Sequence, residues 1–454
     1  MVDLAINQKQ SFFLEKLFVF SIIFEPLLYF QLINVNDVGI GTHISRVLQV
    51  LVILGLLTRV IFSSKGIGLF FPDFFSNKFN FFWLYFIAGI FSTVMGYGVW
   101  GNYFIFSGDL IVSRVVIEVV ISLYYFFYFV VFSLYFLKSN TMIDYFFKMF
   151  YAIFLLSIML GVLDLILQYC FSYDLVSRHL IDATDVGFRF HGFFGEPRDA
   201  YGALILFASV LCLKRYKEGR GYFRPSSGLL IFLGLLTFSV SAILGIICTG
   251  ILIIIFSCIK FNAKQNVKFF AVVFLLFFIG VSYINSSNRL LIYMDDFVFL
   301  YEHLEALIRS PTQFGHIGLL LGPQSVDVFP ILDILRELKG FNVFQFIWGH
   351  GIGSASVLNQ NYMSFIGVSN PRSNIIRLLY DNGVIGSLLF LWIFLSPMKL
   401  IGSYRKEITI TMLFILGAFL AHRSSIPYIY LGILLSVVRQ KNLSLMLHSK
   451  TLST

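Results

Sequence analysis

The stretch that decides the fold is residues 143–168, IDYFFKMFYAIFLLSIMLGVLDLILQ. Between Lys148 and Asp164 it contains no charged residue. A helix needs about 20 mainly apolar residues to cross a lipid bilayer. The apolar residues follow one another without alternating, which favours a helix over a strand of a transmembrane barrel. The stretch therefore predicts a membrane-spanning helix.

Comparable stretches occur along the whole chain of 454 residues, of which 58% are hydrophobic and 13% charged. Soluble domains carry roughly 25% charged residues, so this composition excludes soluble globular and disordered proteins. We predict an all-α polytopic integral membrane protein with about twelve transmembrane helices. The predicted spans are, approximately, 12–33, 44–62, 79–97, 110–136, 143–168, 198–213, 228–239, 242–259, 268–285, 373–396, 407–421 and 426–438.

This pattern divides the chain into three parts. Residues 1–285 hold helices one to nine and an outer loop at 170–196, residues 286–371 form one large outer loop, and residues 372–454 hold the last three helices and a tail. We interpret the first span as a retained helix, because no small-residue cleavage site follows it.

The basic residues predict how the helices are oriented. If the N-terminus is cytoplasmic, most Lys residues fall in inner loops and in the tails, so both termini are predicted to be cytoplasmic. The basic residues on the outer side are all Arg except Lys339. Arg suits bidentate recognition of phosphate, and Lys acts as a hydrated point charge. The outer Arg residues therefore indicate an anionic ligand, the alternative being simple pairs with outer acids such as Asp182 and Glu337.

The large outer loop carries two amphipathic patterns. Residues 295–310 place Phe297, Leu300 and Leu304 on one helical face, and residues 331–340 read as a second short helix behind Pro330. We expect these helices to lie along the membrane and cover a cavity. The alternative is an independent cap without a chemical role.

A first group of ionisable residues lies where an outer loop enters a span, in GFRFHGFFGEPRDAYG at 187–202. It contains Arg189, His191, Glu196 and Arg198, and Pro197 suits the first turn of a helix. Ionisable residues at such a position indicate function. The structural alternative is a helix cap in which Glu196 pairs with Arg198.

A second group lies in SNPRSNIIRLLYDNGVIGS at 369–387, with Arg372, Arg377, Tyr380 and Asp381. Arg377 and Asp381 are four residues apart and can share a helix face.

A glycine-rich stretch, WGHGIGS at 348–354, contains His350. We interpret it as a tight turn whose backbone approaches a ligand. A nucleotide-binding motif would need a cytoplasmic location, and the spacing of His, Asp and Glu predicts no metal site.

In this order the segments resemble the O-antigen polymerase and ligase superfamily of bacterial envelope glycosyltransferases. The resemblance is carried by RFHGFFGEPRDAYG, by FSVSAILG at 238–245, by WGHGIGS, and by SNIIRLLYDNGVIGSLLFLWIF from 373. The spacing from Arg372 to Gly383 is similar to the Arg-x10-Gly pattern of the polymerases, whereas ligases commonly have His at the corresponding position. Asp381 stands where Glu is frequent in the family.

The resemblance implies transfer of a glycan from a polyprenyl pyrophosphate carrier to the non-reducing end of another lipid-linked unit. It also implies a multi-pass protein of the bacterial inner (plasma) membrane, with its active site facing the periplasm. Its partners would be the lipid-linked donor and acceptor, membrane lipid and a chain-length regulator protein, with no cofactor, no metal and no nucleic acid. The catalytic candidates are Glu196, Arg189 and Arg372, and the candidates for binding substrate are His191, Arg198, Arg289, His350, Arg377, Tyr380 and Asp381.

The chemistry fits these residue types. Arg residues can stabilise the charge that grows on a leaving pyrophosphate, and a carboxylate or imidazole can accept the proton of the acceptor hydroxyl. Glu196 is the first candidate base, followed by Asp381 and His350. The alternatives are an O-antigen ligase, a lipid-linked oligosaccharide flippase, and a membrane receptor or scaffold, which would leave the outer Arg residues without a role. A transporter is less favoured because no repeat of one half of the chain in the other is visible.

Overall fold

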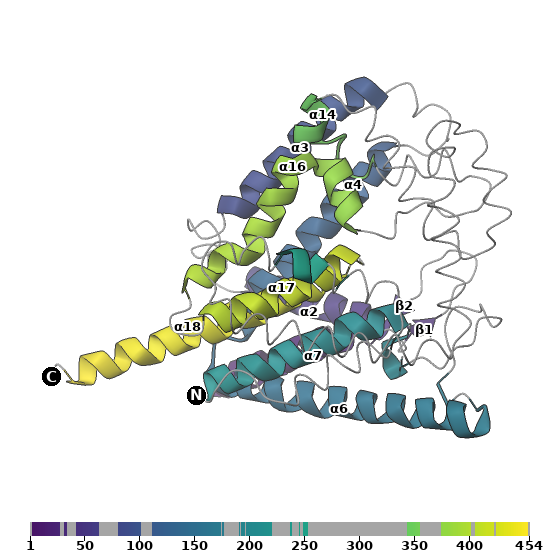
Figure 1. Ribbon diagram of the computed structural model, residues 1–454. Helices are drawn as coiled ribbons and strands as arrows, with labels where there is room; N and C mark the ends of the chain where they lie inside the picture. Colours follow the sequence, from purple (N-terminus) through teal and green to yellow (C-terminus); the bar gives the residue numbers. More distant parts are fainter. Residues whose placement is uncertain are drawn as a thin grey trace.

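The computed structural model of the chain is helical (Figure 1). It describes residues 2–27, 31–33, 42–62, 80–100, 111–173, 175–176, 190, 192–195, 197–219, 237, 245, 248–252, 343–354, 374–400, 405–421 and 424–452.

Within these residues the helices are mostly long, and one short antiparallel pair of strands joins the first two. In chain order the elements are α1 Val2–Phe24, β1 Gln31–Ile33, β2 Thr42–His43, α2 Ile44–Phe62, α3 Asn80–Trp100, α4 Ile111–Tyr125, the π-helix η4 Phe126–Val131, α5 Phe132–Phe136, α6 Asn140–Phe171, the 3₁₀ turn η5 Gly192–Phe194, α7 Pro197–Lys217, α14 Val343–Trp348, α16 Asn374–Leu395, the 3₁₀ turn η8 Ser396–Leu400, α17 Arg405–Ala421 and α18 Ile426–Leu452.

The predicted all-α class is confirmed, and the chain has helices suited to a membrane. Among the described residues, four helical stretches are long and apolar enough to cross a bilayer: 44–61, 118–136, 140–171 and 377–398. The total of twelve spans stays a prediction. The predicted spans at 228–239, 242–259 and 268–285 fall largely or wholly outside the described residues, as do the amphipathic helices at 295–310 and 331–340.

Helix α6, which contains the stretch 143–168, has a serine cap at each end. Ser139 precedes α6 in an extended conformation, and its hydroxyl accepts a hydrogen bond from the Met142 N–H at 3.2 Å. At the other end Ser172 takes a left-handed conformation (φ 52°), and its N–H donates to the Gln168 carbonyl at 3.1 Å. Helix α6 therefore extends three residues beyond each end of the predicted span 143–168.

The first predicted span, 12–33, has the wrong boundaries. Helix α1 ends at Phe24, and residues 31–33 form a strand that pairs with β2. Pro26 explains the end, because the residue before a proline is disfavoured in the helical conformation. Glu25 is thus placed after the helix, where its carboxylate contacts the start of α2.

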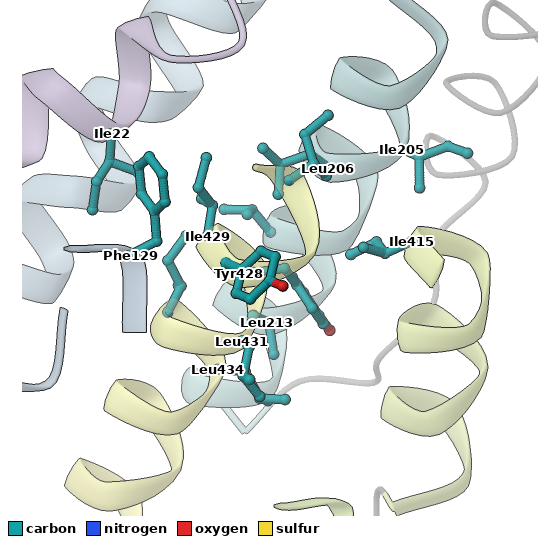
Figure 2. Close-up of a cluster of buried hydrophobic side chains, with 14 of the residues drawn as sticks. Ile22, Phe129, Ile205, Leu206, Leu213, Ile415, Tyr428, Ile429, Leu431 and Leu434 are labelled. Atoms are coloured by element: carbon teal, nitrogen blue, oxygen red, sulfur yellow. The ribbon is translucent and has the colours of Figure 1, made fainter. Parts of the chain in front are cut away.

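One well-packed region joins helices from both ends of the chain. Helix α18 packs against α7, η4 and α5, and α17 packs against α7 and α16. Figure 2 shows side chains that fill the space between these helices and α1, including Ile22, Phe129, Leu206, Ile415 and Ile429. In lipid, close packing between helices replaces the hydrophobic effect as the force for association. Gly432 illustrates it, since a Cβ there would lie 2.0 Å from the Phe129 carbonyl oxygen.

A second group of elements contains α3, α14 and α16. Helices α3 and α16 pack along each other, and the short α14 packs against the same end of both (Figure 1). This group holds the part of the candidate site that the structure describes.

Candidate functional site at the break in helix α16

Helix α16 is interrupted in its first half. Gly383 has φ 62° and ψ −169°, a conformation that is open essentially only to glycine. The break frees the carbonyl groups of Tyr380 and Asp381 for partners outside the helix. The backbone N–H groups of His350 and Gly351 donate to them, each at 2.9 Å. The Asp381 carbonyl also accepts from the Ser92 hydroxyl of α3 at 2.8 Å.

The glycine-rich turn after α14 supplies these donors because it has almost no side-chain bulk. Gly349, Gly351 and Gly353 all have positive φ. A Cβ on Gly349 would lie 2.5 Å from the Asp381 carbonyl oxygen, and one on Gly351 would lie 2.9 Å from Thr93 Cα. The close contacts of this backbone are with α16 and α3, and its approach to a ligand stays a prediction. Two segments about 30 residues apart in sequence form one unit.

A buried charged cluster lies on the N-terminal side of the break. Arg377 contacts the Glu118 carboxylate of α4 at 2.5 Å and the Asp381 carboxylate at 3.5 Å. The side chains of Glu118, Arg377 and Asp381 are all buried. Asp381 also accepts hydrogen bonds from the Gly353 N–H and the Ser354 hydroxyl, both at 3.0 Å. The predicted sharing of a helix face by Arg377 and Asp381 is confirmed, and the glycine-rich turn completes the coordination of the carboxylate.

His350 and Tyr380 lie beside this cluster. Their rings stack with centroids 4.3 Å apart and planes within 9°. His350 is 7% exposed, and burial lowers its pKa to about 4, so its ring is neutral at neutral pH. A base of such low basicity in a buried position is poorly suited to take a proton from a hydroxyl. Of the three candidate bases, Asp381 and His350 both have structural contacts here.

Glu118 is the member of the cluster that the sequence did not single out. It is an isolated acid in an otherwise apolar run of α4, and an acid in such a run is a signal for function. The sequence could not pair it with Arg377, because that contact joins two helices that are far apart along the chain.

The first group of predicted residues is described only in part. Helix α7 begins at Pro197, as the sequence predicted. Just before it, Phe190 and Phe194 are fully buried, and Gly192 packs against Gly161 of α6. The side chain of Arg198 and the whole of Arg189, His191 and Glu196 lie outside the described residues. Arg289 and Arg372 lie outside them as well.

The structure also forms a second polar cluster that the sequence did not predict, here called the Glu25 cluster. Glu25 is 6% exposed, and it accepts hydrogen bonds from three side chains of α2 and from one side chain in the turn before α18. These donors are Ser45, Arg46, Gln49 and Ser425. His43 and Tyr124 bind to Ser45 and Gln49, and so extend the cluster.

The described residues contain no group of three or more His, Cys, Asp or Glu side chains that could hold a metal ion. Comparison of the chain with protein-family models, with curated proteins and with solved structures gives no match.

Proposed function

We propose that the protein is a membrane glycosyltransferase that polymerises polyprenyl-pyrophosphate-linked oligosaccharide units at the outer face of a bacterial inner membrane. It would transfer the growing glycan from its lipid carrier to the non-reducing end of another lipid-linked unit. The proposal also includes twelve membrane spans, cytoplasmic termini and an active site that faces the periplasm.

One observation carries the proposal. The glycine-rich turn and the start of α16, which both belong to segments that resemble the polymerases, join in one buried unit around Arg377 and Asp381. Burying three charges without water costs several kcal/mol per ion before their mutual attraction is counted. A cluster of this kind in an apolar helix bundle is a candidate for function.

Within this unit Arg377 is best suited to a positioning role. Both carboxylates that contact it compensate its charge, so it is less available to a pyrophosphate than an unpaired guanidinium. It fixes the N-terminal half of α16, and Arg372 precedes that helix directly. We assign the contact with the leaving pyrophosphate to Arg189, Arg198, Arg289 and Arg372, where a positive charge stabilises the transition state.

Glu196 remains the proposed base that takes the proton of the acceptor hydroxyl. The residues next to it are held firmly, because Phe194 is fully buried and α7 begins immediately afterwards. A base must be held within about 3 Å of the hydroxyl that it deprotonates. Two neighbours of Glu196 in the sequence, the buried Phe194 and the helix that begins at Pro197, could support it in this way.

The break in α16 also favours a second candidate, a flippase for lipid-linked oligosaccharides. Transporters often bind their substrates at interrupted membrane helices. Transporters place such sites near the middle of the bilayer, and Gly383 lies close to the midpoint of α16. We therefore keep the flippase as the alternative.

The test is glycan profiling of a deletion strain complemented with variants. Arg372→Ala or Arg189→Ala should be inserted in the membrane at normal levels but yield no long glycan chains, and lipid-linked single units should accumulate on the outer side. Arg59→Ala, at the predicted cytoplasmic end of α2, is the matched control and should give normal chains.

The outcomes separate the candidates. Normal chain lengths in both outer variants would refute the site assignment. Lipid-linked units that stay on the cytoplasmic side in the deletion strain would identify a flippase. Long chains that remain on the lipid carrier and are not passed to another acceptor would identify a ligase.

A further inference from the structure

Residues 343–354, which comprise α14 and the glycine-rich turn, belong by sequence to the large outer loop, yet they pack along α3 (Figure 1). A Cβ on Gly89 of α3 would lie 2.6 Å from the Ile352 Cδ1 atom, and one on Gly96 would overlap the His350 carbonyl oxygen. The turn therefore follows α3 from Gly96 to Gly89.

Helix α3 serves as a ruler for the depth of this turn in the membrane. Its predicted span is 79–97, and residues 82–96 form an apolar helical stretch. Gly89 lies eight residues before the predicted outer end of the span, which corresponds to about 12 Å along a helix. The hydrocarbon core of a bilayer is about 30 Å thick, so Ile352 lies near its middle if α3 spans as predicted.

The face of α3 that receives the turn consists of small residues. Gly89, Ser92, Thr93 and Gly96 are three and four positions apart and so share one side of the helix. Small residues in membrane helices let another backbone approach closely. A Cβ on Gly351 would lie 2.9 Å from Thr93 Cα, so the turn uses this space fully.

The backbone of the turn needs no water for its hydrogen bonds. Each N–H group of residues 349–354 donates to an acceptor of the protein at 2.7–3.2 Å. The acceptors are, in order, the carbonyl oxygens of Gln345, Tyr380 and Asp381, Thr93 Oγ1, Asp381 Oδ2 and the Gly351 carbonyl oxygen. Irregular backbone at membrane depth is tolerated only where protein or a water-filled cavity satisfies it, and this turn meets that condition.

Helix α14 turns apolar side chains away from the packed turn. Its exposed side chains are Val343 (76%), Phe344 (41%), Phe346 (53%) and Ile347 (36%). The exposed apolar side chains of α3 are Leu84, Ile87, Ile90, Phe91, Val94 and Met95. The two surfaces adjoin, because the rings of Phe91 and Trp348 pack with centroids 4.8 Å apart.

We propose that residues 343–354 form a re-entrant segment that enters the outer half of the bilayer beside α3, with lipid hydrocarbon chains covering the exposed side of α14. A surface of this kind is unfavourable in water, whereas it continues the lipid-facing side of α3. Helix α14 has six residues and a length of about 9 Å, too short to be a further membrane span. The proposal changes the predicted outer loop 286–371 in this one place and does not depend on the proposed glycan reaction.

Re-entry explains how the charge of Asp381 is accommodated at this depth. Asp381 is 3% exposed, and its carbonyl oxygen accepts from the Ser92 hydroxyl of α3, so it lies at the level of the turn. The turn supplies the Gly353 N–H and the Ser354 hydroxyl to the carboxylate oxygens. These donors replace the water that a carboxylate would otherwise need.

The test measures what surrounds α14 in the full-length protein in lipid nanodiscs. The native cysteines, Cys170, Cys212, Cys248 and Cys258, are replaced by Ala, and a nitroxide spin label is attached in Phe346→Cys or Ile347→Cys. Electron paramagnetic resonance then measures collisions with oxygen, which concentrates in hydrocarbon, and with a water-soluble nickel chelate. Both labels should collide often with oxygen and several-fold less often with the chelate than a label in water.

Two matched variants provide the references. Ile87→Cys, on the exposed side of α3, represents hydrocarbon, and Lys138→Cys, at an exposed residue just after α5, represents water. Labels on α14 that match Ile87→Cys support the re-entrant segment. Labels that match Lys138→Cys would place α14 in water and overturn the proposal. Labels shielded from both reagents would overturn it as well, because a second copy of the chain or another protein would then cover α14.

Discussion

At the scale of single residues, the candidate site depends on charged side chains that are buried against one another in the folded protein. Arg377 lies between Glu118 and Asp381, and all three are buried. Only the pair with Asp381 follows from the sequence, because positions four apart on a helix are neighbours. The Glu118 contact requires α4 and α16 to meet.

The first prediction concerns the removal of the buried cation. Arg377→Ala should destabilise the protein by roughly 3–5 kcal/mol, because two buried carboxylates lose their partner. Glu118→Gln should have a smaller effect, since the amide keeps the shape and one hydrogen bond. Thermal unfolding in detergent, followed by size-exclusion chromatography, measures both.

The double variant Glu118→Gln with Arg377→Gln separates stability from function. It should recover only the part of the thermal midpoint that the unpaired Glu118 charge costs, because Asp381 still lacks its partner, while long glycan chains stay absent if Arg377 positions the reacting groups. If Arg377→Ala unfolds at the wild-type temperature, the cluster does not stabilise the fold.

At the scale of elements, glycine decides how α16 and the turn before it fit together. The predicted span 373–396 is confirmed in extent. Its break at Gly383 was not predicted, although Gly383 follows Asp381 and Asn382, which are residue types common in turns. The tight turn predicted at Gly349, Gly351 and Gly353 is confirmed, and the structure adds that it packs against α16 and α3. Sequence reveals a flexible backbone, whereas the surface against which it packs depends on distant residues.

The second prediction tests this fit with one methyl group. In Gly383→Ala a Cβ would lie 2.4 Å from the Ile347 carbonyl oxygen and 2.5 Å from the Gly349 nitrogen. The turn would be pushed off α16, so we expect loss of long glycan chains and a lower thermal midpoint. Gly219→Ala is the control, since Gly219 also has positive φ (70°) but nothing within 4 Å.

The control should lose only the cost of the backbone conformation, roughly 1 kcal/mol. Equal thermal midpoints and equal glycan profiles for the two variants would show that the contact between the turn and α16 is unimportant.

At the scale of the whole molecule, the orientation of the helices in the membrane stays a prediction. The N-terminus and the C-terminus of the chain lie on the same side of the view in Figure 1, and β1 and β2 lie toward the other side. The sequence assigns the termini to the cytoplasm and those short elements to the outer side.

The third prediction checks this orientation directly. A fluorescent protein fused to the C-terminus should fluoresce, because it folds in the cytoplasm. Alkaline phosphatase fused within residues 315–325 should be active, because it folds only outside. The same phosphatase fused after Lys217 is the control and should be inactive. Activity in the opposite places would reverse the orientation and with it the periplasmic location of the site.

The sequence by itself determined the class of protein, the positions of most described helices and the residues that deserve testing. Helices α2 and α7 begin within a residue of their predicted starts, because in lipid every backbone polar group must be paired within the segment. Length and apolarity are local properties, so a single segment is enough to reveal them.

The tertiary structure alone decided which polar groups meet. It joined Glu118 to Arg377, the glycine-rich turn to the break in α16, and Glu25 to Ser425 across 400 residues of sequence. The physical reason is the high cost of a buried charge without partners, which obliges distant helices to supply them. Those partners are set by helix packing, which the order of residues along one segment does not contain.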